Sequence, residues 1–265
     1  MLLERFLWAK ADEVARLRQQ ERKGALPVPF SGQRGDFIAA LQRREAGVPL
    51  TVIAEFKQAS PSRGPICRSL TVEEAARQYV AAGAGALSIL TERRFFAGEL
   101  DFLGRAAACC PGTPLLRKDF IFDPLQVRAT AATPAAALLL IVALTPDAAL
   151  LRRLREQTES LGMQAVVEVC GKKDLVLARE SGARIIQVNA RDLDTLRVDR
   201  QACLELARQC PPERGEIWIA ASGMDRREHL EEAARAGFSA ALVGTGLLAL
   251  ACLGEAAGFY GRYFR

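Results

Sequence analysis

The sequence is poor in features that would bind a metal or cross a membrane. It has a single histidine, His229, and no Cys-x-x-Cys pair among its seven cysteines. Because zinc sites are built from closely spaced Cys and His, no metal site is expected, and free thiols in a reducing cytosol are the simplest interpretation. No apolar run reaches the ~18 residues of a membrane span, and charges interrupt the N-terminal segment where a signal peptide needs an apolar core. We therefore expect a cytoplasmic protein with no membrane partner.

A large excess of one charge is also missing. The 265 residues carry a net charge of +5, and no block rich in Lys and Arg stands out. Nucleic acid is therefore not an expected partner, whereas a mild positive balance suits a small anionic substrate. No low-complexity linker divides the chain, and its length suits one α/β barrel. We predict a single domain over residues 1–265.

The sequence does contain a regular alternation of apolar runs with charged, Ala/Leu-rich segments of helical period. Eight such units of roughly 20–30 residues predict a (β/α)8 TIM barrel of the α/β class over residues 51–265, after an N-terminal helical extension over residues 1–50. Three predicted helices end at a glycine suited to a C-cap, Gly83, Gly182 and Gly237. The predicted strands are Thr51–Phe56, Ala86–Leu90, Pro114–Arg117, Ala137–Ala143, Gln164–Val169, Ile185–Val188, Glu216–Ala220 and Ala240–Val243. The predicted helices include Met1–Lys23, Val72–Ala82, Pro124–Ala132, Pro146–Leu161, Lys172–Ser181, Arg200–Gln209 and Arg226–Ala236. The first of them would carry an apolar face made of Leu2, Leu3, Phe6, Leu7, Val14 and Leu17.

Polar side chains gather at the ends of the predicted strands, where barrels of this kind place their chemistry. Glu55 and Lys57 end the first strand, and side chains i and i+2 of a strand project from the same face. Taken singly, each strand-end residue is better explained by structure, as half of an ion pair or as a helix cap, than by function. Two lysines and two glutamates at one barrel mouth instead predict a site tuned for proton transfer. The other strand-end groups are Thr91 and Glu92, Lys118 and Asp119, Glu168, and the run Asn189, Ala190, Arg191 and Asp192.

Two glycine-containing loops predict phosphate binding. Ser222 and Gly223 follow the seventh strand, and Gly244, Thr245 and Gly246 follow the eighth. Glycines let backbone N–H groups approach an anion, and these two loops form the recurrent phosphate site of such barrels. A plain tight turn is the alternative.

Longer motifs match one known family in order and spacing from the first predicted strand to the last. The most specific are residues 53–64, Ile-Ala-Glu-Phe-Lys-Gln-Ala-Ser-Pro-Ser-Arg-Gly, and residues 116–120, Leu-Arg-Lys-Asp-Phe. They resemble the indole-3-glycerol phosphate synthase family of tryptophan biosynthesis. That family converts 1-(2-carboxyphenylamino)-1-deoxyribulose 5-phosphate into indole-3-glycerol phosphate, CO2 and water, without a metal or organic cofactor. Further matches are Leu87–Glu92, Phe96–Gly98, Leu139–Leu144, Val167–Val169, Asn189–Leu193, Ser222–Gly223 and Val243–Thr245.

The resemblance implies a role for each matching position. Lys118 would be the general acid that protonates the ribulose carbonyl, and Glu168 a general acid and base in ring closure and in the loss of water. Lys57 would hold the substrate anion, Glu55 would orient the lysines, and Asn189 would hydrogen-bond the substrate. Phe96 and Phe120 would pack on the aromatic ring. The remaining substrate- and phosphate-binding positions would be Ser60, Ser62, Arg191, Ser222, Gly223, Gly244, Thr245 and Gly246.

The sequence also departs from the family pattern. Ala221 stands where a glutamate is usual, and Gln187 replaces a glycine, with a side chain that either points outward or narrows the pocket. Cys170 and Ala136 are interpreted as structural drift. Three functions stay open: the synthase itself, a related enzyme acting on a modified anthranilate, and a phosphate-binding barrel without turnover. The protein is expected to be a monomer or a weak homodimer.

Overall fold

Eight parallel strands form a closed barrel, which confirms the predicted fold class. The computed structural model describes residues 2–43, 47–66, 69–244, 247–248 and 252. Each strand pairs in parallel with its neighbours, and β1 closes the ring between β10 and β4. The strands are β1 (Thr51–Phe56), β4 (Ala86–Leu90), β5 (Leu115–Lys118), β6 (Ala137–Ile141), β7 (Gln164–Val169), β8 (Ile185–Asn189), β9 (Ile217–Ala221) and β10 (Ala240–Val243).

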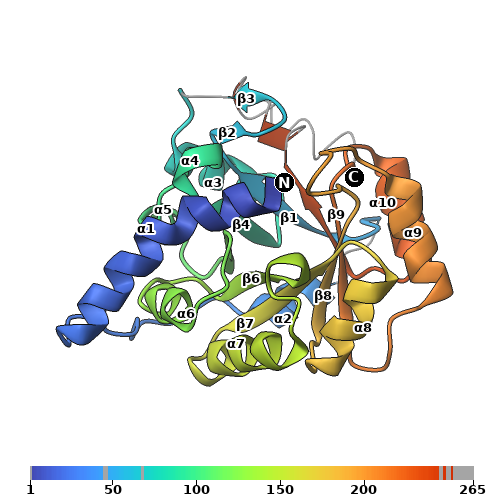
Figure 1. Cartoon of the computed structure of the whole chain (residues 1–265). Coiled ribbons are helices and arrows are strands. Elements are labelled where there is room, and N and C mark those ends of the chain that lie inside the picture. The colour runs from blue at the N-terminus through green and yellow to red at the C-terminus, as the bar shows by residue number, and fades with distance from the viewer. Residues whose placement is uncertain (1, 44–46, 67–68, 245–246, 249–251, 253–265) are drawn as a thin grey trace.

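Helices connect successive barrel strands and surround the barrel (Figure 1). The six helices predicted between the strands are confirmed to within two residues at each end. Capping boxes at Thr71 and Asp123 fix two of their N-termini, and Gly83, Gly182 and Gly237 adopt the positive φ that favours glycine at a helix end. The helices are α3 (Val72–Ala81), α5 (Phe102–Cys109), α6 (Pro124–Ala131), α7 (Ala148–Ser160), α8 (Lys172–Glu180), α9 (Arg200–Gln209) and α10 (Arg227–Arg235).

Four strands end at other residues than predicted. β6 stops at Ile141, and the rest of its apolar run forms the 3-10 helix η1 (Val142–Leu144), so the predicted end at Ala143 is wrong. β5, β8 and β9 continue for one residue beyond the prediction. Lys118 and Asn189 are therefore the last residues of their strands, which places their side chains by the rigid sheet and not by a loop.

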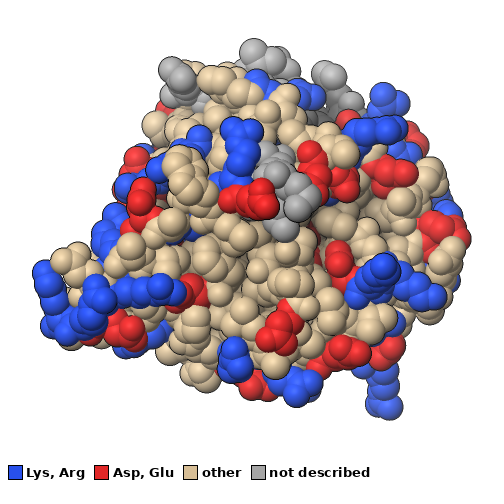
Figure 2. All heavy atoms as spheres, in the orientation of Figure 1, with Lys and Arg blue, Asp and Glu red and all other residues tan. Residues whose placement is uncertain are grey.

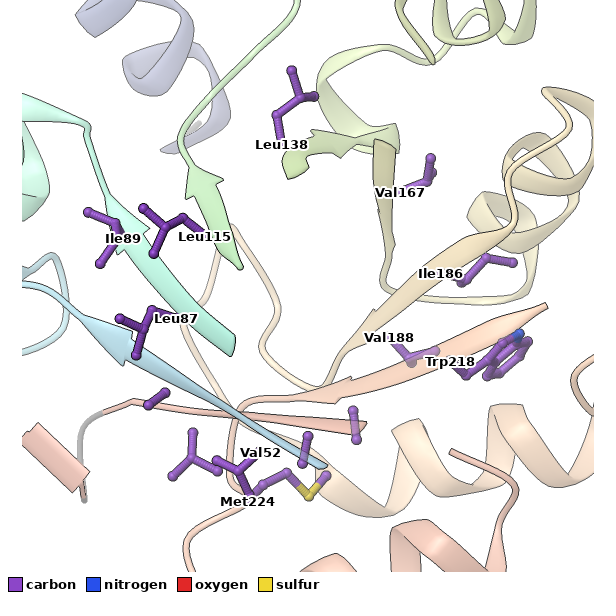
Figure 3. Packing of buried hydrophobic residues seen from close by; sticks show 14 of the residues in the cluster. Val52, Leu87, Ile89, Leu115, Leu138, Val167, Ile186, Val188, Trp218 and Met224 are labelled. Atoms are coloured by element: carbon purple, nitrogen blue, oxygen red, sulfur yellow. The ribbon is translucent and has the colours of Figure 1, made fainter. Parts of the chain in front are cut away.

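Strand alternation divides the apolar core into two layers. One layer fills the barrel with side chains such as Ile53, Leu139 and Ile219. The other lies between the strands and the helices and includes Val52, Leu87, Leu115, Val167, Ile186 and Trp218 (Figure 3). Because each strand is apolar on both faces, a polar side chain on the inner face stands out as a candidate for function.

The N-terminal helix α1 (Leu2–Arg22) crosses one side of the barrel beside α6 (Figure 1). The predicted apolar face is confirmed for Phe6, Val14 and Leu17, which are buried, whereas Leu7 is 36% exposed. The side chains of Leu2 and Leu3 are not among those described. Charges of both signs are interspersed over the face in Figure 2, and Lys and Arg gather at the outer end of α1. The short helix α2 (Phe37–Gln42) precedes β1.

Charged side chains also connect α1 to the barrel. The buried Lys10 Nζ lies 2.9 Å from Asp119 Oδ2, and Arg117 Nη2 lies 2.7 Å from the same oxygen. Arg117 Nη2 also contacts Glu13 Oε1 of α1 at 3.1 Å. Thr91 Oγ1 donates a 2.6 Å hydrogen bond to Asp119 Oδ2. These five residues form the α1 network.

The cysteines are not all free thiols. Cys109, Cys110, Cys170, Cys203 and Cys210 are free, but Cys252 is disulfide-bonded, which corrects the expectation for that residue. In the described part of the chain, no helix is both long and apolar enough to cross a membrane.

Candidate active site

The candidate site lies at the carboxyl ends of the barrel strands, as predicted. Two adjoining cavities of about 370 Å³ and 110 Å³ open there and share Glu55, Lys57, Lys118, Asn189, Arg191 and Ser222 in their walls. The larger is also lined by Arg63, Ala221, Gly223, Asp225 and Gly244. The smaller is also lined by Phe6, Ser60, Ser62, Phe96, Phe120 and Glu168.

Glu55 and Lys57 form the ion pair that strand alternation predicts. Glu55, 4% exposed, accepts a hydrogen bond from Lys57 Nζ. Burial alone would raise the pKa of Glu55, but the charges of Lys57, Lys118 and Arg191 outweigh it and hold that pKa below its ordinary value. A Cβ at Gly244 would lie 2.5 Å from Glu55 Oε1 and 3.0 Å from Lys57 Nζ, so glycine is the residue that fits against this pair.

Lys118 and Glu168 meet inside the barrel mouth, from β5 and β7 on the two sides of β6. Lys118 Nζ lies 3.5 Å from Glu168 Oε2, with 18% of the Lys118 side chain and 1% of the Glu168 side chain exposed. Asn189 Nδ2 donates to Glu168 Oε1 at 3.1 Å. Gln187 Nε2 donates to Glu168 Oε2. Gln187 therefore points into the barrel and contacts Glu168, so the alternative of an outward, harmless side chain is wrong.

Asn189 also organises the side of the site that carries the predicted phosphate loop. Its Oδ1 accepts hydrogen bonds from Ser222 Oγ at 2.8 Å and from the Arg191 backbone N–H at 3.0 Å. Ser222 has a φ of 69° and Gly223 a φ of 74°. Such a conformation is costly for a residue with a Cβ and is concentrated at functional sites. Ser222, Gly223 and Gly244 line the larger cavity, whereas Thr245 and Gly246 lie outside the described residues.

An aromatic wall closes the smaller cavity. Phe120 stacks on Phe6 with ring centroids 4.1 Å apart, and Phe96 lies 6.1 Å from Phe120. Phe96 belongs to α4 (Arg93–Phe96), whose first N–H groups donate to the Glu92 carboxylate. Phe96 and Phe120 were predicted here, and Phe6 was predicted only as part of the apolar face of α1.

A small hairpin brings two predicted serines to the same cavity. β2 (Ala59–Ser60) pairs with β3 (Gly64–Pro65), and Ser60 Oγ lies 3.4 Å from Ser62 Oγ. Arg63 of this hairpin reaches the larger cavity, which sequence reasoning missed. Its only signal was its place in the Ser-Pro-Ser-Arg-Gly loop.

Several strand-end groups serve structure instead. Thr91 and Asp119 belong to the α1 network, and Glu92 caps α4. Asp192 is exposed and accepts hydrogen bonds from Thr195 and the Asp194 N–H. The interpretation as an ion pair or a helix cap therefore holds for Asp119 and Glu92, whereas Thr91 and Asp192 make hydrogen bonds of other kinds.

A closed parallel barrel with charged groups at the carboxyl ends of its strands is the architecture of (β/α)8-barrel enzymes. The family model described as indole-3-glycerol phosphate synthase matches residues 3–255. The chain belongs to this family. It is 42% identical over 254 residues to the indole-3-glycerol phosphate synthase of Chloroherpeton thalassium, covering 93% of this chain and 94% of the relative. It is 39% identical over 255 residues to that of Chlorobaculum tepidum, covering 93% and 95%.

Solved structures support the fold alone. A 3-hexulose-6-phosphate synthase superposes with a TM-score of 0.58 at 16% sequence identity, covering 79% of this chain and 98% of that chain. A structure described as native KDPGal gives a TM-score of 0.57, also at 16% identity, covering 83% and 96%.

Proposed function

We propose that this chain is an indole-3-glycerol phosphate synthase. It would close the indole ring of 1-(2-carboxyphenylamino)-1-deoxyribulose 5-phosphate and release CO2 and water, as a carboxy-lyase of tryptophan biosynthesis. The observation that carries the proposal is the meeting of Lys118 with Glu168 at 3.5 Å, between an aromatic cavity and a cationic one. Membership of the family indicates which reaction to expect, and the Lys118–Glu168 contact provides an acid and a base that suit this reaction.

Lys118 and Glu168 would share the proton transfers. As the aryl carbon that bears the carboxylate attacks the ribulose carbonyl, Lys118 would donate a proton to the carbonyl oxygen. The C–CO2 bond then breaks and returns its electron pair to the ring. Glu168 would act as acid and base in ring closure and in the later departure of the hydroxyl group as water. Its near-complete burial and its hydrogen bonds from Asn189 and Gln187 support this role, because they hold the carboxylate in one place.

The two cavities suit the two ends of the substrate. Phe6, Phe96 and Phe120 offer apolar surface to the anthranilate ring. Lys57, Arg63 and Arg191 with the backbone of Ser222, Gly223 and Gly244 would bind the phosphate and carboxylate groups. Glu55 would orient Lys57, to which it is hydrogen-bonded. No metal or organic cofactor takes part in this scheme.

A second candidate is favoured by one observation. Ala221 lines the larger cavity at the position where the family resemblance leads one to expect a glutamate. Compared with glutamate, alanine leaves more space in this cavity and contributes no negative charge to its wall. A substituted anthranilate could use that room. We propose a cytoplasmic enzyme, monomeric or weakly dimeric, in either case.

Indole fluorescence on mixing the purified protein with the ribulose substrate tests the proposal. We expect fluorescence to rise with time and in proportion to enzyme concentration. Turnover of a ring-substituted substrate alone would favour the second candidate. Binding of the substrate without any fluorescence at high enzyme concentration would leave the phosphate-binding barrel as the function.

A further inference from the structure

Among the residues that the structure describes, Gln187 is the one in contact with the Glu168 carboxylate that the family resemblance does not supply. The Cα atoms of Glu168 and Gln187 pair in register on β7 and β8, so both side chains enter the barrel at the same level. Gln187 is fully buried. Its Nε2 donates to Glu168 Oε2, and its Oε1 has no hydrogen-bond partner among the residues that the structure describes. A buried amide oxygen without a partner is costly and calls for an explanation.

Of the described groups around Glu168, Gln187 is the one that has a hydrogen-bonding atom to spare. Lys118 on β5 supplies a cation, and Asn189 already gives its amide to Glu168 and its oxygen to Ser222. Ile141, which pairs with Glu168 on β6, is apolar. Although Cys170 is exposed as a residue, local desolvation of its thiol and the charge of Glu168 raise the pKa of that thiol to about 12, so it stays neutral.

We propose that Gln187 is a positioning residue that holds Glu168 in both of its protonation states. An ionised carboxylate only accepts hydrogen bonds, and the Gln187 NH2 group donates one. A protonated carboxyl has an O–H to donate, and rotation of the amide by half a turn would present the unpartnered Oε1 to accept it. Glycine at this position could do neither. This inference rests on the proposed function, because only an acid and base that changes state during turnover needs such a partner.

Substitution of Gln187 tests the inference through the pH profile. Gln187→Met keeps the length but removes both hydrogen bonds. We expect kcat to fall roughly ten- to hundredfold through misplacement of Glu168. The acidic limb of the kcat profile should move up by about 0.5–1 pH unit, because the bond that Gln187 donates to the ionised carboxylate is charge-assisted and stronger than the bond that it accepts from the neutral carboxyl. Gln187→Glu should move the limb further, since two adjacent carboxyls resist double ionisation.

Ser88→Ala is the matched control. Ser88 is also fully buried in the barrel wall with an unpartnered oxygen, but no contact with Glu168 is described. The Ser88→Ala substitution should leave the acidic limb of the kcat profile at its wild-type pH. Circular dichroism and thermal melting check that each variant folds, and Gln187→Gly, the residue of the family pattern, replaces any that does not.

The outcomes separate this inference from the proposed function. A limb that stays at its wild-type pH in the Gln187→Met and Gln187→Glu variants would reduce Gln187 to a packing residue and overturn the inference, whether or not kcat falls. An inactive wild-type protein would instead overturn the proposed function.

Discussion

Two charged clusters meet at the end of β5, where Arg117, Lys118 and Asp119 follow one another. Arg117 and Asp119 belong to the α1 network, in which both are almost fully buried. Asp119 accepts hydrogen bonds from Lys10, Thr91, Arg117 and the Phe120 N–H. Lys118 lies between them in sequence but faces the barrel mouth, with 18% of its side chain exposed and Glu168 3.5 Å away.

The difference between the clusters lies in how fully their hydrogen-bonding capacity is used. The α1 network is closed, because its charges are paired and shared among several partners and all of them except Glu13 are buried. The mouth cluster, which consists of Glu55, Lys57, Lys118 and Glu168, lines two cavities. A substrate that enters these cavities can replace some of its contacts. A closed buried network stabilises one arrangement and is expensive to break, whereas an open pair retains capacity for chemistry. Neighbouring charges on one strand can therefore serve stability and catalysis separately.

Loss of the Lys118 amine should have the largest effect. We expect Lys118→Ala to lower kcat by roughly two to four orders of magnitude, the scale of a positioned proton donor. Steady-state fluorescence assays measure it, with Lys173→Ala, an exposed lysine on α8, as the control. A near-normal kcat would mean that Lys118 is not the general acid. It would also weaken the distinction between a structural α1 network and a catalytic mouth cluster.

Loss of the Arg117 charge should instead be seen in stability. Arg117→Met leaves the carboxylates of Asp119 and Glu13 without one of their partners, so the free energy of unfolding should fall by about 3–5 kcal/mol. Urea unfolding measures this change. Arg128→Met is the matched control, since Arg128 also reaches a glutamate of α1, Glu21, but is 48% exposed and should change stability by only about 0.5 kcal/mol. Equal effects for the two arginines would contradict a closed network.

The sequence indicated the barrel well because its strands are buried apolar runs between amphipathic helices. It missed α5, whose Phe-Leu-Gly-Arg-Ala-Ala-Ala-Cys sequence has a short apolar face and an internal Gly104. Phe6 and Lys10 could not be placed, because their contacts join α1 to residues about a hundred positions away. Gln187 could have been placed: it stands two residues before Asn189, and the same alternation that paired Glu55 with Lys57 points it into the barrel.

Acid should weaken the closed network in a defined range. Burial alone would raise the pKa of Asp119, but Arg117, Lys10 and the hydrogen bond from Thr91 lower it to about 2. Since the unfolded value is about 3.9, this carboxylate stabilises the fold above that pH, by about 2 kcal/mol, and the contribution is lost as pH falls toward 2. Urea unfolding between pH 6 and pH 3 should therefore show a shallower loss of stability in Asp119→Asn than in the wild type. Asp101→Asn, at an exposed aspartate, should keep the wild-type slope.

The smallest effect is expected when an acid is placed beside the mouth cluster, at position 221. Ala221 pairs in register with Asn189 and lines the larger cavity, together with Lys57, Lys118 and Arg191. In Ala221→Glu, a new carboxylate would find cations within the same wall, so the fold should persist. If the missing acid limits the rate, kcat/KM should rise by up to about tenfold, or about 1.4 kcal/mol of transition-state stabilisation.

Combining this change with Gln187→Gly sharpens the result, because the pair restores the family pattern at both positions. If Gln187 compensates for the absent acid, the gain from Ala221→Glu should be larger in the Gln187→Gly background, a non-additivity that a double-mutant cycle measures. Equal gains in both backgrounds would make the two positions independent. Ala221→Glu could instead lower kcat/KM for the ordinary substrate and lower it less for a ring-substituted substrate. That result would mean that the mouth cluster is adapted to alanine at position 221.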